Sequence, residues 1–118
     1  MTAPHRLFVY GTLAPDQPND HVLAGISGVW SRGTVRGRLR EIGWGATMGY
    51  PAIRLDPHGE EVAGYLLEST DLPAHWPRLD SFEGADYCRT LTEVRTENGD
   101  LVEAYVYVAR SVPQDNAP

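Results

Sequence analysis

The hydrophobic residues of this chain fall into short runs and alternating stretches, and both patterns are typical of strands. Residues 6–10 (RLFVY) form an apolar run that ends at Gly11, which predicts a buried first strand followed by a turn. In residues 33–42, small or apolar residues alternate with three arginines, which predicts a half-buried strand with one solvated face. Residues 51–55 and 61–68 also have the composition of strands.

Two more strands are predicted near the end of the chain, over residues 87–96 and 101–109. They flank Asn98-Gly99, the strongest short-range hairpin signal in the chain. We therefore expect these two strands to pair as an antiparallel hairpin.

Helical patterns are fewer and shorter. Residues 21–26 (HVLAGI) predict a short helix that Asn19 or Asp20 could cap. Residues 71–82 predict a second helix with Asp71 as its N-cap, although it contains two prolines. Its expected apolar stripe consists of Leu72, Leu79 and Phe82.

The resulting order is β-loop-α-β-β-β-α-β-β. A parallel sheet needs a crossover connection between its strands, usually a helix, and this order lacks such helices. The prediction is therefore an α+β protein whose small, mixed and mostly antiparallel sheet curls into a β-barrel with short flanking helices.

Length and composition indicate an ordinary globular domain. The chain has 118 residues, of which 42% are hydrophobic and 22% charged, so we expect one domain over residues 1–110 and a flexible tail over residues 111–118. One cysteine cannot form an internal disulfide, no apolar run approaches the ~20 residues that span a bilayer, and the N-terminus lacks a secretory signal pattern. A cytoplasmic protein without membrane contact is expected.

The charge balance argues against a nucleic-acid partner. The net charge is −6, and binding to a phosphate backbone depends on clustered cations. All ten basic residues are arginine, so a mechanism through a lysine Schiff base is excluded.

Most familiar catalytic patterns are missing. The four histidines are scattered and no Cys-x-x-Cys occurs, so we predict no metal site and no cofactor. The glycines between residues 43 and 49 lack the spacing of a nucleotide-binding loop, and we interpret them as an irregular segment. Cys88 with His75 could form a thiol and base pair, but a buried apolar role on a strand suits Cys88 better.

Two local features could carry chemistry. At Tyr10-Gly11-Thr12-Leu13 a buried strand breaks into a loop, where free backbone N–H groups can cradle an anion, or simply form a turn. At Glu83-Gly84 a predicted helix ends, and the helix dipole there disfavours a negative charge and raises the pKa of the carboxyl group. Alternatively, Glu83 is a solvated surface charge.

These features belong to a series of motifs that resembles the γ-glutamylcyclotransferase-like family, including its AIG2-like and γ-glutamylamine cyclotransferase branches. The similarity covers roughly residues 6–109. The motifs occur in order as LFVYGTL (7–13), YPAI (50–53), VAGYLLE (62–68), LDSFEG (79–84), YCR (87–89) and AYVY (104–107).

The resemblance implies a small β-barrel enzyme that cleaves a γ-glutamyl amide and releases 5-oxoproline and an amine. It implies that Glu83 is the general acid and base, and that the loop from Tyr10 to Leu13 holds the glutamyl group. It further implies that Tyr50 and Tyr87 line the pocket. Residues 14–19 lack the lysine that some branches have, so the leaving amine stays open.

Two other functions remain possible from the sequence. One is a binding module without catalysis on the same fold, since a fold does not fix a function. The other is a hydrolase or acyltransferase that acts on a γ-glutamyl natural product. The oligomeric state is not predicted.

Overall fold

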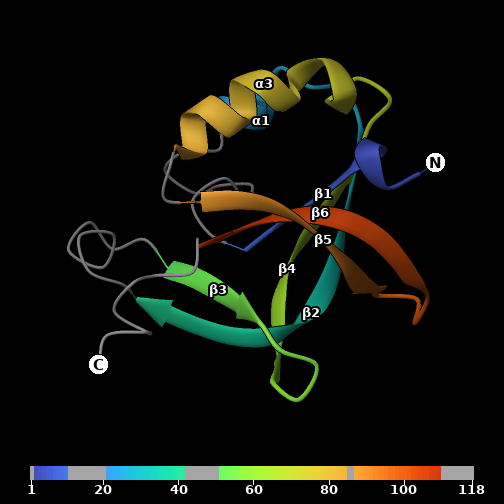
Figure 1. The fold of residues 1–118 in the computed structure, drawn as a ribbon. Helices are drawn as coiled ribbons and strands as arrows, with labels where there is room; N and C mark the ends of the chain where they lie inside the picture. The colour runs from blue at the N-terminus through green and yellow to red at the C-terminus, as the bar shows by residue number, and fades with distance from the viewer. Residues whose placement is uncertain (1, 11–20, 42–50, 85–86, 110–118) are drawn as a thin grey trace.

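The computed structural model describes residues 2–10, 21–41, 51–84 and 87–109. Its elements follow the predicted order (Figure 1). They are η1 (Ala3–His5), β1 (Arg6–Val9), α1 (His21–Ala24), β2 (Val29–Glu41), β3 (Pro51–Leu55), β4 (Glu60–Glu68), α3 (Leu72–Glu83), β5 (Tyr87–Thr96) and β6 (Leu101–Ala109). The predicted irregular segment at 43–49, the caps at Asn19 and Asp20 and the tail at 111–118 lie outside the described residues.

The strands form one sheet that closes on itself. Their order is β3-β2-β4-β1-β6-β5, and a further pairing joins β5 to β2. Five strands thus complete a ring, and β3 extends β2 beside it. Among the described strands, β1 and β6 pair in parallel and the other ladders are antiparallel. This confirms the small, mixed, mostly antiparallel barrel.

The alternation predicted for β2 is confirmed where its side chains are described. Val35 is buried in the barrel interior, whereas Arg36 and Arg38 point outward with 57% of their side chains exposed. Among the described residues, eight buried side chains fill the interior, and they come from all six strands, namely Phe8, Val35, Ile53, Val62, Leu66, Val94, Ala104 and Val106. Burial of this apolar surface is the main force that closes the sheet.

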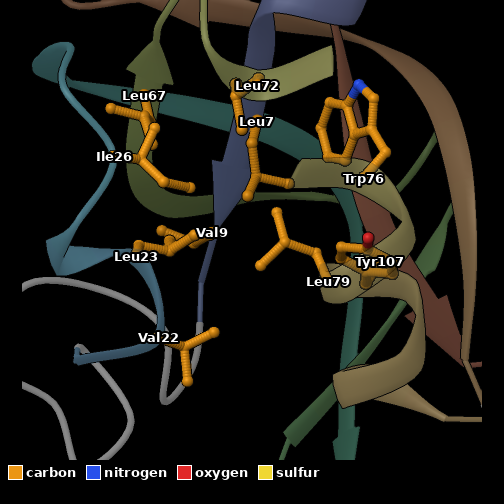
Figure 2. Packing of buried hydrophobic residues seen from close by; sticks show 10 residues of the cluster. All are labelled: Leu7, Val9, Val22, Leu23, Ile26, Leu67, Leu72, Trp76, Leu79 and Tyr107. Atoms are coloured by element: carbon orange, nitrogen blue, oxygen red, sulfur yellow. The ribbon is translucent and has the colours of Figure 1, made fainter. Parts of the chain in front are cut away.

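A second apolar layer joins the helices to the outside of the barrel. Figure 2 shows Leu7, Val9 and Leu67 of the strands facing residues of α1 and α3. The buried side of α3 consists of Leu72, Trp76 and Leu79, which lie four and three residues apart and therefore share one face. The sequence prediction was wrong for Phe82, which is 45% exposed.

Helix α3 begins and ends where the sequence predicts, within one residue. Asp71 is the N-cap residue, but its side chain makes no capping hydrogen bond. Instead its backbone N–H donates to the Oγ of buried Ser69 at 3.0 Å. At the other end Gly84 has φ of 81°, a backbone conformation that strongly favours glycine, and it stops the helix directly after Glu83.

The Asn98-Gly99 hairpin is confirmed. Gly99 has φ of 90°, and the turn is closed by Thr96 N–H donating to the Asp100 carbonyl at 2.8 Å.

In the described ranges, no helix is long and apolar enough to cross a membrane.

Candidate active site

Glu83 is the last residue of α3 and is only partly exposed to solvent. Loss of water around the carboxyl group raises its pKa to about 7. The direction of this pKa shift agrees with the sequence prediction, and burial of the carboxyl group is its cause in the structure. A carboxyl group that titrates near neutral pH can both accept and donate a proton there.

Tyr10 directly follows β1 and makes two hydrogen bonds through its hydroxyl group. The hydroxyl accepts a bond from the Ile53 N–H at 3.0 Å and donates one to the Tyr107 carbonyl at 2.8 Å. Burial raises the pKa of Tyr10, the hydrogen bond from the Ile53 N–H offsets part of this rise, and the negative charges of Tyr87 and Glu83 add to it. Tyr10 is therefore neutral at physiological pH and shares one neighbourhood with Tyr87 and Glu83.

Tyr87 begins β5, three residues after Gly84. Its backbone N–H donates to the Gly84 carbonyl at 3.3 Å, which places the start of β5 next to the end of α3. The side chain is half-buried and packs beside the apolar layer under the helices. The fold thereby brings together Tyr10, Glu83 and Tyr87. Glu83 and Tyr87 lie on neighbouring elements, and Tyr10 lies far from both in the sequence.

Gly11, Thr12, Leu13 and Tyr50 lie outside the described residues. The loop predicted to cradle the substrate is therefore represented only by Tyr10, the residue that leads into it. Cys88 is described, and it is half-buried on β5 rather than fully buried.

A polar network that the sequence analysis missed lies one turn before Glu83. The Asp80 carboxylate accepts two hydrogen bonds from Arg89, at 3.0 and 3.2 Å, and one from the Tyr107 hydroxyl at 2.6 Å. Partial burial opposes the charge of Asp80, but these bonds hold its pKa below the usual value. Asp80 and Arg89 stand in the LDSFEG and YCR motifs, and their opposite charges could have suggested the pair.

Arg89 is also packed against aromatic rings. Its guanidinium carbon lies 4.4 Å from the centroid of the Trp76 ring and 5.0 Å from that of Tyr105. Cation–π contacts of this kind hold an arginine in one orientation while its charge pairs with a carboxylate. The network is thus anchored in the apolar layer beneath α3.

A separate groove of about 380 Å³ opens where β2 and β5 diverge. Its lining includes Thr34, Arg36, Leu55, Glu61, Glu93 and Arg95. Charges of both signs face it, and Arg36 is already paired with Glu61 at 3.9 Å. The predicted site residues that the structure describes do not line this groove. Within the same described ranges, no three His, Cys, Asp or Glu side chains are grouped to hold a metal ion.

Comparison with known proteins places the chain in a family. The family described as Gamma-glutamyl cyclotransferase, AIG2-like matches residues 7–118. Among curated proteins, no significant match is found.

Solved structures with a similar fold agree with this match. An AIG2-like protein from Mus musculus is 30% identical, with a TM-score of 0.71 over 92% of this chain and 78% of that one. YkqA from Bacillus subtilis is 27% identical, with a TM-score of 0.68 over 90% of this chain but only 36% of its own length. A structure titled Gamma-glutamyl cyclotransferase shares the fold, with a TM-score of 0.65 and 18% identity over 89% of this chain and 66% of that one.

The chain belongs to the γ-glutamyl cyclotransferase, AIG2-like family. Its membership supports an enzyme with an activity of the γ-glutamyl cyclotransferase type that acts on small molecules.

Proposed function

We propose that this protein cleaves a γ-glutamyl amide by intramolecular attack of the substrate's α-amine, and releases 5-oxoproline and an amine. The observation that carries the proposal is the state of Glu83. This carboxyl group is partly buried, has a pKa of about 7 and lies near Tyr10, which leads into the predicted cradle. It is therefore suited to proton transfer at neutral pH.

The reaction forms one C–N bond and breaks another. The α-amine attacks the γ-carbonyl carbon, a five-membered ring closes, and the original amide nitrogen leaves as an amine. Because nucleophile and electrophile belong to one molecule, correct orientation supplies much of the rate, with effective molarities of about 10⁵–10⁸ M for such closures. No cofactor is required for this chemistry.

Glu83 performs the two proton transfers in this proposal. As a carboxylate it takes a proton from the α-ammonium group, which makes the nitrogen nucleophilic. As a carboxylic acid it then gives that proton to the departing nitrogen, so the enzyme returns to its starting state. A positioned acid–base group of this kind contributes on the order of 10²–10⁴-fold to the rate.

The remaining substrate contacts are assigned from the family resemblance. The backbone N–H groups of Gly11, Thr12 and Leu13 would hold the glutamyl group or the oxyanion that develops on the γ-carbonyl, where one lost donor costs about 3 kcal/mol. Tyr50 and Tyr87 would line the pocket. Tyr10 contributes through its position before the loop, since its hydroxyl already has two hydrogen bonds.

The test is a panel of γ-glutamyl amides with different leaving amines, analysed by mass spectrometry. We expect 5-oxoproline and the free amine from at least one substrate. Free glutamate would instead indicate hydrolysis, and turnover of no substrate would favour a binding module.

Two control substrates test the nucleophile. Acetylation of the α-amine removes it, and a β-aspartyl amide would have to close a strained four-membered ring. Both controls should give no product if cyclisation is the reaction. Turnover of the acetylated substrate would contradict the proposed mechanism, because only an external nucleophile could cleave it.

A further inference from the structure

We propose that Tyr107 is a positioning residue that fixes the Glu83 end of α3 against the barrel wall and ties it to the strand end that leads into the predicted cradle. The inference rests on the proposed function for its catalytic meaning. Its geometric part, the placement of Glu83, can be tested without any substrate.

The first contact holds the helix. Tyr107 lies on β6 in the layer beneath α3, beside Leu79 (Figure 2). Its hydroxyl donates to the Asp80 carboxylate at 2.6 Å. Asp80 stands three residues before Glu83, which places the two side chains on neighbouring positions of one helix face.

Asp80 is also bonded through its main chain to the residue that ends the helix. Its backbone carbonyl accepts the Gly84 N–H at 3.0 Å, the bond that closes the last turn around Glu83. The same residue is therefore held by its side chain to the sheet and by its main chain to the turn that carries Glu83. A shift of the Asp80 side chain would move that turn.

The second contact of Tyr107 reaches the other half of the site. Its backbone carbonyl accepts the hydroxyl of Tyr10 at 2.8 Å, and that hydroxyl in turn accepts the N–H of Ile53 on β3. One residue of β6 is thus bonded to the helix with the acid–base carboxyl and to the residue before the cradle. Such convergence can set the distance between them, and a misplacement of about 1 Å can cost ~10²-fold in rate.

Removal of the Tyr107 hydroxyl should loosen the helix end while the ring keeps the apolar layer filled. Water would then reach Glu83 more easily. Since burial raises the pKa of this group, hydration should lower it toward the ordinary value of 4.5. The ionisable groups around Glu83 in the described residues include Tyr10, Tyr87, Tyr107 and the Asp80–Arg89 pair. Tyr10 and Tyr107 have raised pKa values and stay neutral during this titration.

The experiment compares Tyr107→Phe with Tyr105→Phe. Tyr105 lies two residues earlier on the same strand, and its hydroxyl makes no hydrogen bond within the described residues, so the control loses the same atom without the contact. Glu83 is titrated through the ¹³C signal of its carboxyl group, identified by its disappearance in Glu83→Gln. Initial rates give kcat and KM for each variant.

We expect Tyr107→Phe to lower the pKa of Glu83 by about one pH unit or more and kcat by about tenfold, with KM within about twofold. Tyr105→Phe should match the wild type. An unchanged pKa of Glu83 in folded Tyr107→Phe would overturn the inference. If the wild type releases no 5-oxoproline, the proposed function fails, and the titration still decides the role of Tyr107.

A second variant covers the possibility that Tyr107→Phe does not fold, which circular dichroism would reveal. Asp80→Asn keeps the shape of the side chain but removes the negative charge that accepts hydrogen bonds from Arg89 and Tyr107. Like Tyr107→Phe, it should lower both the pKa of Glu83 and kcat. Wild-type values for both quantities would contradict the inference.

Discussion

Glu83 combines partial burial with the absence, in the described part of the chain, of any cause for its pKa shift other than lost hydration. Burial without a compensating cation makes ionisation costly, so the group stays protonated to a higher pH. This one property has consequences for both activity and stability.

Activity should follow the ionised fraction of Glu83. Because the carboxylate is the base that starts the proposed reaction, kcat/KM should rise with pH up to about 7 and then level off. At pH 5 it should be about 100-fold below the plateau, as expected for a base two pH units below its pKa. Steady-state rates across pH 5–8 measure this, and a level profile between pH 5 and 7 would contradict it.

The free energy of unfolding should decrease as pH rises, whereas activity increases. The unfolded state loses the Glu83 proton near pH 4.5 and the folded state near 7, so unfolding is favoured as pH rises between these values. The difference between these two pKa values corresponds to about 3 kcal/mol of free energy of unfolding. Glu83→Gln carries no charge and avoids the cost of burying one. The difference in free energy of unfolding between Glu83→Gln and the wild type should therefore grow by about 3 kcal/mol from pH 4 to pH 8, in favour of the variant.

Urea unfolding at several pH values would measure this difference. Glu93→Gln is a suitable control because Glu93 is exposed on β5. A constant difference between Glu83→Gln and the wild type from pH 4 to 8 would show that the environment of Glu83 does not oppose its charge.

At the scale of single residues, local sequence patterns predicted that Glu83 lies at a helix end. They did not predict the hydrogen bonds that hold this helix end to the sheet. The end of the helix is determined by neighbouring residues, since Gly84 permits the positive φ that stops α3. The bonds from Arg89 and Tyr107 to Asp80 cross from helix to sheet. Partners of this kind depend on how the elements pack, which no local pattern contains.

At the scale of elements, two of the glycines that the structure describes occupy positive-φ positions with open space around the site of a Cβ atom, namely Gly84 and Gly99. Gly84 combines φ of 81° with ψ of −175°, a region that is almost exclusive to glycine. Substitution by alanine should therefore cost on the order of 1–3 kcal/mol at Gly84 and roughly 1 kcal/mol at Gly99.

The effect on activity should separate the two variants. Gly84→Ala distorts the turn that carries Glu83, so kcat should fall more than tenfold. Gly99→Ala lies in the β5–β6 turn and should keep the wild-type kcat below its melting temperature. Equal kcat values for both variants would indicate that the end of α3 does not set the position of Glu83.

The elements themselves were largely predictable. Alternation located β2, and the Asn98-Gly99 signal gave both strands of the hairpin with the correct bounds. The apolar stripe of α3 was less accurate, because Trp76 and not Phe82 completes the buried face. Trp76 fits there because its indole N–H donates to the Pro4 carbonyl at 3.0 Å, a partner that only the folded chain brings close.

At the scale of the whole molecule, the barrel depends on a short seam. In the described residues, the ladder between β2 and β5 consists of Gly33 with Thr96 and Thr34 with Arg95, and the adjacent Glu97 N–H donates to the Arg32 carbonyl at 3.2 Å. A Cβ atom on Gly33 would lie 2.8 Å from Cγ1 of Val94 and 3.0 Å from the Arg95 carbonyl oxygen. The absence of a side chain therefore allows the two strands to meet.

Gly33→Ala should lower the free energy of unfolding by about 1–3 kcal/mol through overpacking. Gly25→Ala is the control, since a Cβ there meets nothing within 4 Å. The seam lies at the end of β5 remote from Tyr87, so kcat should be retained while the protein is folded. Urea denaturation measures the change, and wild-type stability of Gly33→Ala would contradict the importance of the seam.

The sequence predicted a curled sheet but not which strands close it. Closure by β2 and β5 and the parallel pairing of β1 with β6 join residues far apart in the chain. They follow from the twist and packing of the complete sheet. The parallel pairing of β1 with β6 also brings Tyr10, which follows β1, next to Tyr107, whose backbone carbonyl accepts its hydroxyl.

The most direct test of this account is the release of 5-oxoproline by Glu83→Gln, compared with Glu93→Gln and the wild type on the best substrate of the panel. Glutamine keeps the size of the side chain but cannot accept and return a proton. We expect Glu83→Gln to bind substrate and to lose on the order of 10²–10⁴-fold in turnover, with no loss in Glu93→Gln. Release of 5-oxoproline by Glu83→Gln at the wild-type rate would contradict the central claim.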